Sequence, residues 1–421
     1  VGTMHAMHRM KQATSIVLVL AAWTATGVCD AKKLLATLDD PDAPSAPVRA
    51  ITRGPKFHWF GYYDTLQFDS TGRYVLSLEV DFEGRSPKAD DVIAVGMVDL
   101  KDNDKWIELG KTRAWCWQQG CMLQWRPGSD SEVLWNDRED GKFICRILDV
   151  KTRKLRTLPR AVYHVNPDGK RALGADFARI NHMRPGYGYA GVEDRNRDVL
   201  RPDDSGIHLL DLETGRSRTI LTIAQVAKIA YPNPTPQDKH YFNHIQWSPD
   251  GKRFIFLHRW RSPKARSFLT RMFTAAADGS DVRLVTDKPN ISHFEWRDPT
   301  HISIWRGKYL LYRDDGSGRE ELMWDAPNGH QSYLPGKKWL ITDTYPRGKE
   351  RKHNLYLHHL PTARAVPLGR FHEPPQYKGE WRCDLHPRLS RDGRTVCIDS
   401  THGGNGRQLY LVDISTAGTG N

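Results

Sequence analysis

The 421-residue chain lacks several features that mark common protein classes. Its apolar run at residues 16–23 is too short to cross a bilayer. No interior segment is rich in Gly, Ser or Pro, so no linker divides the chain into domains. Lys and Arg are scattered, which argues against a nucleic-acid partner although the net charge is +12. Helical periodicity is limited to residues 223–230, which argues against a mainly helical fold.

Cysteine is also scarce, with six residues in the chain. One of them, Cys29, follows a basic segment, the apolar run and small residues, a pattern typical of a signal peptide over residues 1–30. Val28 stands where a lipoprotein anchor would need Gly or Ala, so we expect a secreted or periplasmic protein without an anchor. Five cysteines then remain, and an odd number leaves an unpaired thiol, either metal-bound or buried and inert.

A hairpin-turn signal recurs along the rest of the chain, for example at residues 248–251 and 390–393. Pro fixes φ at one corner of such a turn and Gly accepts the positive φ of another. Short apolar strands follow the turns, and roughly seven such units fill the chain. We therefore predict an all-β, seven-bladed β-propeller of the TolB or WD40 kind over residues 51–416. Residues 31–50 would be a lead-in and residues 417–421 a disordered tail; a two-sheet sandwich fits the repeat less well.

Four histidines occupy one position relative to these turns, before the turn of four successive units: His244, His293, His330 and His386. The innermost strands of a propeller line its central channel, so we expect these rings to converge near one mouth of it. This register predicts a functional ring of histidines.

A metal site is predicted at the same place. The residues His330, Cys383, His386 and His402 form an N/S ligand set that suits structural zinc or another divalent cation. Cys383 and His386 are three residues apart, so both can face one ion only where the strand is irregular. The alternative is a disulfide between Cys383 and Cys397, which leaves the histidines free of metal.

Aromatic, Arg and His side chains also gather in the N-terminal half. Residues 58–64 read HWFGYYD, Arg179 follows Tyr163 by sixteen residues, and a loop at residues 181–189 comes next. Aromatic rings stack on pyranose faces, and Arg binds carboxylates through two parallel hydrogen bonds. An acidic polysaccharide or oligosaccharide is the predicted partner of a monomeric protein. The predicted substrate-binding residues are His58, Tyr62, Gln119, Asn243, Tyr187 and His293.

These features together resemble the β-propeller polysaccharide lyases: the ulvan and rhamnose–glucuronate lyases and, more distantly, the oligogalacturonate lyases. The matching parts are the HWFGYYD opening, the Tyr163 and Arg179 pair, and the carboxy-terminal Cys and His group. The resemblance implies a β-elimination enzyme in which Tyr163 is base and acid and Arg179 neutralises the uronate carboxylate. It also implies a structural zinc.

The chain departs from the ulvan lyases in one respect. Where those enzymes carry a catalytic histidine pair, this chain has Gln118, Gln119, Asn136 and Asp137. Glutamine cannot act as a base, so the base would be Tyr163, His244 or His58, with His244 the main alternative to Tyr163.

Two other functions compete with a lyase. A glycoside hydrolase needs two carboxylic acids about 5 to 9 Å apart, for which Asp64, Asp137 and Asp176 are candidates without a clear pair. A non-catalytic, TolB-like scaffold accounts for the turn repeat equally well. The histidine ring and Arg179 favour the enzyme.

Overall fold

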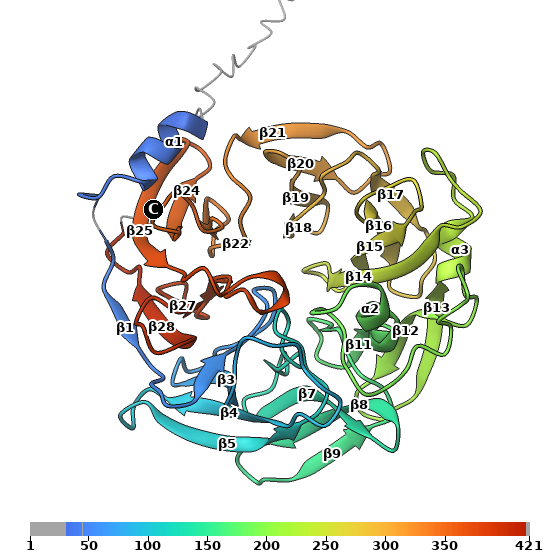
Figure 1. The fold of residues 1–421 in the computed structure, drawn as a ribbon, viewed down its shortest axis with the longest axis horizontal. Helices are drawn as coiled ribbons and strands as arrows, with labels where there is room; N and C mark the ends of the chain where they lie inside the picture. Colours follow the sequence, from blue (N-terminus) through green and yellow to red (C-terminus); the bar gives the residue numbers. More distant parts are fainter. Residues whose placement is uncertain (1–30, 44, 418–421) are drawn as a thin grey trace, which may run out of the picture.

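The computed structural model describes residues 31–43 and 45–417, which form a ring of seven four-stranded antiparallel sheets (Figure 1). This confirms the predicted seven-bladed β-propeller. The predicted signal peptide at residues 1–30 and the predicted tail beyond residue 417 lie outside the described residues.

Six blades consist of four strands that are consecutive in the chain and run from the channel outward. The first three are β2 (Phe57–Trp59), β3 (Tyr74–Val80), β4 (Ile93–Asp99) and β5 (Lys105–Thr112); β6 (Gln124–Trp125), β7 (Glu132–Glu139), β8 (Lys142–Asp149) and β9 (Leu155–Leu158); and β10 (His164–Val165), β11 (Arg171–Gly174), β12 (Gly206–Asp211) and β13 (Ser217–Thr222). The next three are β14 (Lys239–Trp247), β15 (Arg253–Arg261), β16 (Leu269–Ala276) and β17 (Arg283–Thr286); β18 (Phe294–Asp298), β19 (His301–Trp305), β20 (Tyr309–Arg313) and β21 (Glu320–Trp324); and β22 (Gln331–Tyr333), β23 (Trp339–Asp343), β24 (Lys352–His359) and β25 (Arg364–His372).

The seventh blade joins the two ends of the chain. It contains β26 (Arg388–Leu389), β27 (Thr395–Ser400) and β28 (Gln408–Asp413), and its outer strand is β1 (Val48–Ala50). Val48 pairs with Val412 and Ala50 with Tyr410 in antiparallel register, so the blue and red ends of the chain meet in one sheet (Figure 1). The propeller therefore begins before residue 51, inside the segment predicted as a lead-in. Three residues carry too little periodic pattern for a strand to be read from them.

The turns between the first two strands of each blade explain why the repeat is readable. Their glycines adopt the positive φ that the turn requires, with 68° at Gly169, 66° at Gly251 and 69° at Gly393. Apolar side chains from the strands and from the segments beside them then pack between neighbouring blades, and they include seven tryptophans that are almost fully buried: Trp59, Trp115, Trp117, Trp125, Trp135, Trp296 and Trp324.

The helices are short. α3 (Ile223–Ala227) confirms the predicted helical segment and begins with a capping box between Thr222 and Gln225. α1 (Ala31–Leu38) and a 3₁₀ turn at Gly379–Trp381 were not predicted.

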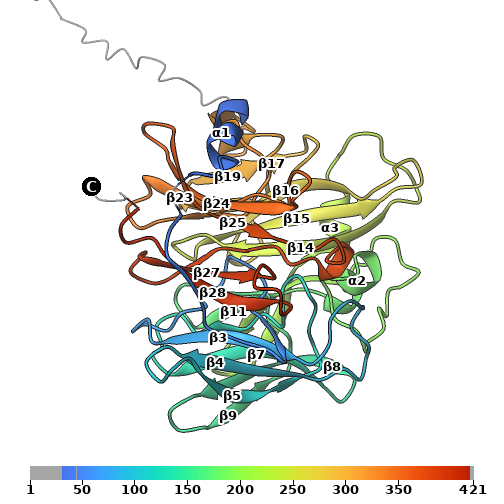
Figure 2. The ribbon, with the colours of Figure 1, turned by 60° about the vertical axis from the view of Figure 1, so that its left-hand side comes forward.

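α2 (Phe177–Met183) was not predicted either. α1 lies at the outer edge of the ring, whereas α2 lies near its centre (Figure 1, Figure 2). Among the described residues, no helix combines the length and the apolar character that crossing a membrane would require.

Candidate functional site

The four predicted histidines meet at one end of the central channel. His244 lies in β14, His293 and His330 directly precede the inner strands β18 and β22, and His386 stands two residues before β26. The ring centroids of His293 and His330 are 4.0 Å apart, and those of His330 and His386 are 4.2 Å apart. All four side chains are buried. The predicted convergence is confirmed. Residues at the same distance from the turn in successive blades lie at the same height along the channel.

Two tyrosines from the first blade complete the histidine cluster. The Tyr62 ring lies 5.2 Å from the rings of both His244 and His386, and the Tyr63 ring lies 5.3 Å from that of His330. They enter the channel after Gly61, whose φ is 115° and where a Cβ would lie 2.7 Å from the carbonyl carbon of Gln119. Only glycine permits this close approach, so the HWFGYYD segment places its tyrosines against the histidines.

Tyr163 and Gln119 hold His244 in place. The Tyr163 hydroxyl accepts a hydrogen bond from the backbone N–H of His244 at 2.9 Å and donates one to Gln119 Oε1 at 2.9 Å. His244 has φ 50°, at an irregularity in the pairing of β14 with β15. A residue other than glycine in this conformation is unusual and is often found at functional positions.

The tyrosines of the cluster differ in acidity. Burial raises the pKa of Tyr62, Tyr63 and Tyr163 well above the usual range.

Tyr187 behaves differently from these three. Burial acts to raise its pKa, but the charges of Arg184 and Arg382 outweigh that effect and the pKa is lowered. The Arg184 guanidinium lies 3.9 Å from the centre of the Tyr187 ring, and Arg382 Nη2 donates to the Tyr187 hydroxyl at 3.0 Å. The Tyr187 ring is also 5.5 Å from the His244 ring. Tyr187 is therefore the tyrosine of this group that most readily exchanges a proton.

Three residues of the cluster can hold a metal ion. One potential ligand atom each from His330, Asp384 and His386 lies within 4.8 Å of the others. His386 Nε2 is buried and makes no hydrogen bond within the described residues. The buried Asp384 carboxylate makes none there either, but its Oδ2 lies 2.7 Å from Arg382 Nε in an ion pair. His330 Nδ1 is 3.0 Å from the Asp343 carboxylate, which orients the ring as a supporting carboxylate does for a metal-bound histidine. Buried polar atoms without partners need an explanation, and a cation between them supplies one.

The zinc ligands predicted from the sequence are wrong at two positions. The backbone N–H of Cys383 donates to Glu373 at 2.7 Å, and its thiol lies beside Arg407 instead of the histidines. His402 packs against Phe371 and Tyr410, with ring centroids 5.0 and 4.1 Å away.

The reason is the alternation of side chains along extended backbone. Asp384 is two residues from His386 and shares its face, whereas Cys383 is three residues away and points elsewhere. All five cysteines in the described part of the chain are unpaired, so Cys383 and Cys397 form no disulfide either.

Arg179, predicted to bind the substrate carboxylate, is a structural residue. It lies in α2 with 1% of its surface exposed. Its guanidinium donates to the carbonyl oxygens of His240 at 2.7 Å, Asn196 at 2.9 Å and Val199 at 2.9 Å. It also forms an ion pair with Asp194 at 3.3 Å. These bonds connect a loop to β14 and occupy the N–H groups of the guanidinium, which leaves no donor for a substrate. The spacing of Arg179 from Tyr163 in the sequence does not reveal this structural role.

Two other arginines beside His244 are free to bind an anion. Nη1 of Arg184 and Nη1 of Arg259 are buried without a hydrogen-bond partner, and among the described residues neither side chain forms an ion pair. Both guanidinium groups lie 4.7 Å from the centre of the Phe268 ring. Burial and then the charges of these two arginines lower the pKa of His244 well below its usual value. Buried cations without counter-ions are expected where an anionic ligand binds.

The remaining predicted residues divide between the cluster and other places. His293 and Asn243 belong to the cluster region: His293 Nδ1 is 3.0 Å from Asn328 Oδ1, and the fully buried side-chain amide of Asn243 has no hydrogen-bond partner in the described part of the chain. His58 does not, because its ring nitrogens contact Gln408 and Glu79 and its ring packs on Trp106.

The acids considered for a hydrolase do not form a pair. Asp137 binds Arg146, and Asp176 caps α2. Asp64 follows the two tyrosines and lies near Glu295, a different acid.

No family model matches this chain, and no curated protein matches it by sequence. Among solved structures, it is similar to an oligogalacturonate lyase from Vibrio parahaemolyticus, with a TM-score of 0.62, 14% identity, 88% of this chain and 94% of that chain covered. It is also similar to an oligogalacturonate lyase in complex with manganese, with a TM-score of 0.63, 16% identity and coverage of 87% and 93%. The tricorn protease gives a TM-score of 0.51 and 12% identity over 87% of this chain and 35% of that chain. At these identities, the similarity establishes the propeller fold.

Proposed function

We propose that the protein is a lyase that cleaves a uronate-containing oligosaccharide or polysaccharide by β-elimination. The observation that carries this proposal is the buried cluster at one end of the channel, where unpaired guanidinium groups lie beside a neutral histidine. Two structural neighbours are named oligogalacturonate lyases, which supports this activity over that of a scaffold.

The first task of such an enzyme is to neutralise the uronate carboxylate, because the proton on the adjacent carbon is otherwise too weakly acidic. Arg184 and Arg259 take this role in place of Arg179. The charges of both arginines act on His244, and binding a carboxylate would satisfy their unpartnered N–H groups. The Phe268 ring between the two guanidinium groups holds them in position.

The second task is proton transfer. His244 is neutral, and a carboxylate held by Arg184 and Arg259 would offset the charges that lower its pKa, so proton uptake becomes easier on substrate binding. Tyr187, whose pKa is lowered, then protonates the leaving glycosidic oxygen. Tyr163 keeps its proton and orients His244 through the hydrogen bond to its backbone.

A divalent cation fits the triad of His330, Asp384 and His386. Two imidazoles and a carboxylate suit Mn²⁺ as well as Zn²⁺, and without Cys383 the set has no thiolate to favour zinc. Burial lowers the pKa of His386, which keeps this ligand neutral and able to bind. When bound, the ion supplies positive charge against an anionic substrate oxygen. One structural neighbour is described in complex with manganese.

The place of action follows from the same proposal. A polymeric uronate is met outside the cytoplasm, and the pattern of residues 1–30 indicates export. We therefore propose that the protein acts as a secreted or periplasmic monomer.

The decisive assay mixes the full chain and Mn²⁺ with polygalacturonate, oligogalacturonates or ulvan and follows the ultraviolet absorbance of the unsaturated product. We expect absorbance to rise with at least one substrate. Arg259→Gln should lower the rate by roughly 100-fold or more, since it removes an anion-stabilising donor. Arg313→Gln is the matched control, because this exposed arginine forms an ion pair with Asp315 alone among the described residues, and it should retain the rate. New reducing ends without a rise in absorbance would show hydrolysis and refute the proposal. Equal rates in the Arg259→Gln and Arg313→Gln variants would also refute it.

A further inference from the structure

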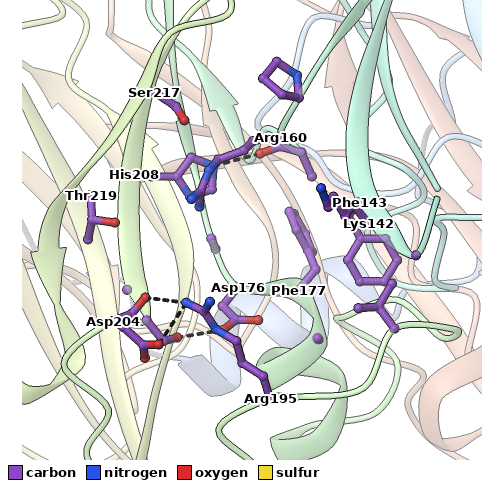
Figure 3. A pocket seen from close by; sticks show the side chains of 18 of the residues that line it. Lys142, Phe143, Arg160, Asp176, Phe177, Arg195, Asp204, His208, Ser217 and Thr219 are labelled. Carbon is purple, nitrogen blue, oxygen red and sulfur yellow. Dashed lines mark hydrogen bonds and ion pairs between the residues drawn. The ribbon is translucent and has the colours of Figure 1, made fainter. Parts of the chain in front are cut away.

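A separate pocket of about 500 Å³ lies between the second and third blades (Figure 3). The β7–β8 hairpin, the start of α2 and the strands β12 and β13 form its walls. It shares no residue with the histidine cluster. Its volume is in the range of small-molecule sites, about 300–1,000 Å³.

Two phenylalanines form an apolar wall. Phe177 is almost fully buried, whereas Phe143 is partly exposed. Both pack on Tyr189, with ring centroids 4.2 and 5.3 Å from it, so their positions are set. The partly exposed Phe143 ring, held in this way, can stack on the apolar face of a sugar.

His208 provides a hydrogen-bond acceptor in the pocket. Its Nε2 lies 3.2 Å from the carbonyl oxygen of Ala161, which can only accept, so Nε2 carries the proton. Burial, followed by the charge of Arg160, lowers the pKa of His208 to about 4, so the ring is neutral and Nδ1 is left to accept from a ligand hydroxyl. Gly174 makes room for this ring, since a Cβ there would lie 2.0 Å from Nε2.

Two cations of the pocket are placed to bind an anion. Arg195 pairs with Asp204 at 3.1 Å, and Asp176 accepts from Ser205 at 2.7 Å. Lys142 and Arg160 also line the pocket, and within the described residues neither takes part in an ion pair. Glu193 is the remaining acid of the lining. The three acids and three bases of the lining balance, and Lys142 and Arg160 are the two cations that no acid of the described residues pairs, beside an aromatic wall and a neutral acceptor.

We propose that this pocket is a second binding site, for an acidic sugar of one or two rings. This inference rests on the proposed function for the identity of the sugar, a uronate. The wall of the pocket also supports the cluster: the Phe177 ring stacks on Tyr163 at 5.6 Å with an angle of 13° between the rings. An occupant of the pocket therefore touches the residue that positions the tyrosine bonded to His244.

The test measures binding of digalacturonate by titration calorimetry. The starting protein is the full chain carrying Arg259→Gln, which weakens the cluster and leaves the pocket intact. Arg160→Glu and Thr219→Trp are then added separately; the first reverses a charge and the second fills the pocket from β13. Both positions are exposed, so the melting temperature should stay unchanged.

We expect the Arg259→Gln protein to bind digalacturonate, and each added substitution to weaken binding about tenfold or more. Cellobiose, which has no carboxylate, should not bind. Absence of binding to the Arg259→Gln protein would overturn the proposal, as would unchanged binding after both added substitutions. Lyase activity is a separate readout, so a chain that lacks it but binds digalacturonate in the pocket would refute the proposed function alone.

Discussion

Replacing Arg179 by Met tests whether this arginine is structural or catalytic. Its three short hydrogen bonds go to the backbone carbonyls of His240, Asn196 and Val199. Each buried acceptor left without a partner costs about 1–3 kcal/mol. Asp194 keeps the hydrogen bond from His182 at 3.0 Å, so its charge stays partly compensated. The sum is about 3–9 kcal/mol, and because the Met side chain still fills the space, we expect a loss near 4 kcal/mol.

The assay is urea denaturation followed by tryptophan fluorescence. Arg195→Met is the matched control, since Arg195 lies in the loop that Arg179 binds and its exposed ion pair with Asp204 should contribute less than about 1 kcal/mol. A clear fall in the urea midpoint for Arg179→Met alone supports the structural role. Equal midpoints in both variants, together with lost turnover only in Arg179→Met, would refute the reasoning and restore the catalytic role.

Three further predictions follow from the cluster. Tyr187→Phe should lower kcat by about 10²–10⁴-fold with little change in KM, because it removes the proposed acid; an unchanged kcat would assign the acid elsewhere. Mn²⁺ at a hundred times its Kd should stabilise the wild type by about 2.7 kcal/mol in thermal melts. Asp384→Asn should lose this gain and Cys383→Ser should keep it, and the reverse pattern would restore the thiolate as a ligand. Burial raises the pKa of Asp64 to about 8 and that of Glu295 to about 7. The folded state then binds more protons than the unfolded state between about pH 4 and 8, so stability falls as pH rises through this window. Asp64→Asn should flatten this dependence in melts from pH 5 to 8, and an equally steep curve would contradict the assignment.

The fold was predictable because its signals are local. Turn residues such as Gly251 and Gly393 set the backbone conformation where they stand, and each short strand follows its own turn. β1 was not predicted because its pairing partner, β28, lies at the other end of the chain, so no local signal marks the strand. α2 was not predicted because it has only seven residues, most of which are buried, so its sequence shows no amphipathic pattern.

The site was predictable only in part. His293 and His330 stand at the same place in the repeats of two neighbouring blades, and the fold brings such residues together in the channel. Their convergence therefore follows from the sequence. The spacing of Asp384 from His386 was a readable signal, since residues two apart share a face of extended backbone. Arg184 and Arg259 carried no such signal, because neither occupies a repeated position.

The sequence by itself determined the propeller and the histidines that line its channel, since both depend on turns and strands that form within a few residues. Only the tertiary structure decided which arginines are free. Arg179 is saturated by carbonyl groups from two other segments, whereas Nη1 of Arg259 has no hydrogen-bond partner among the described residues. Hydrogen-bond satisfaction is a property of neighbours in space, and those neighbours are set by packing between blades.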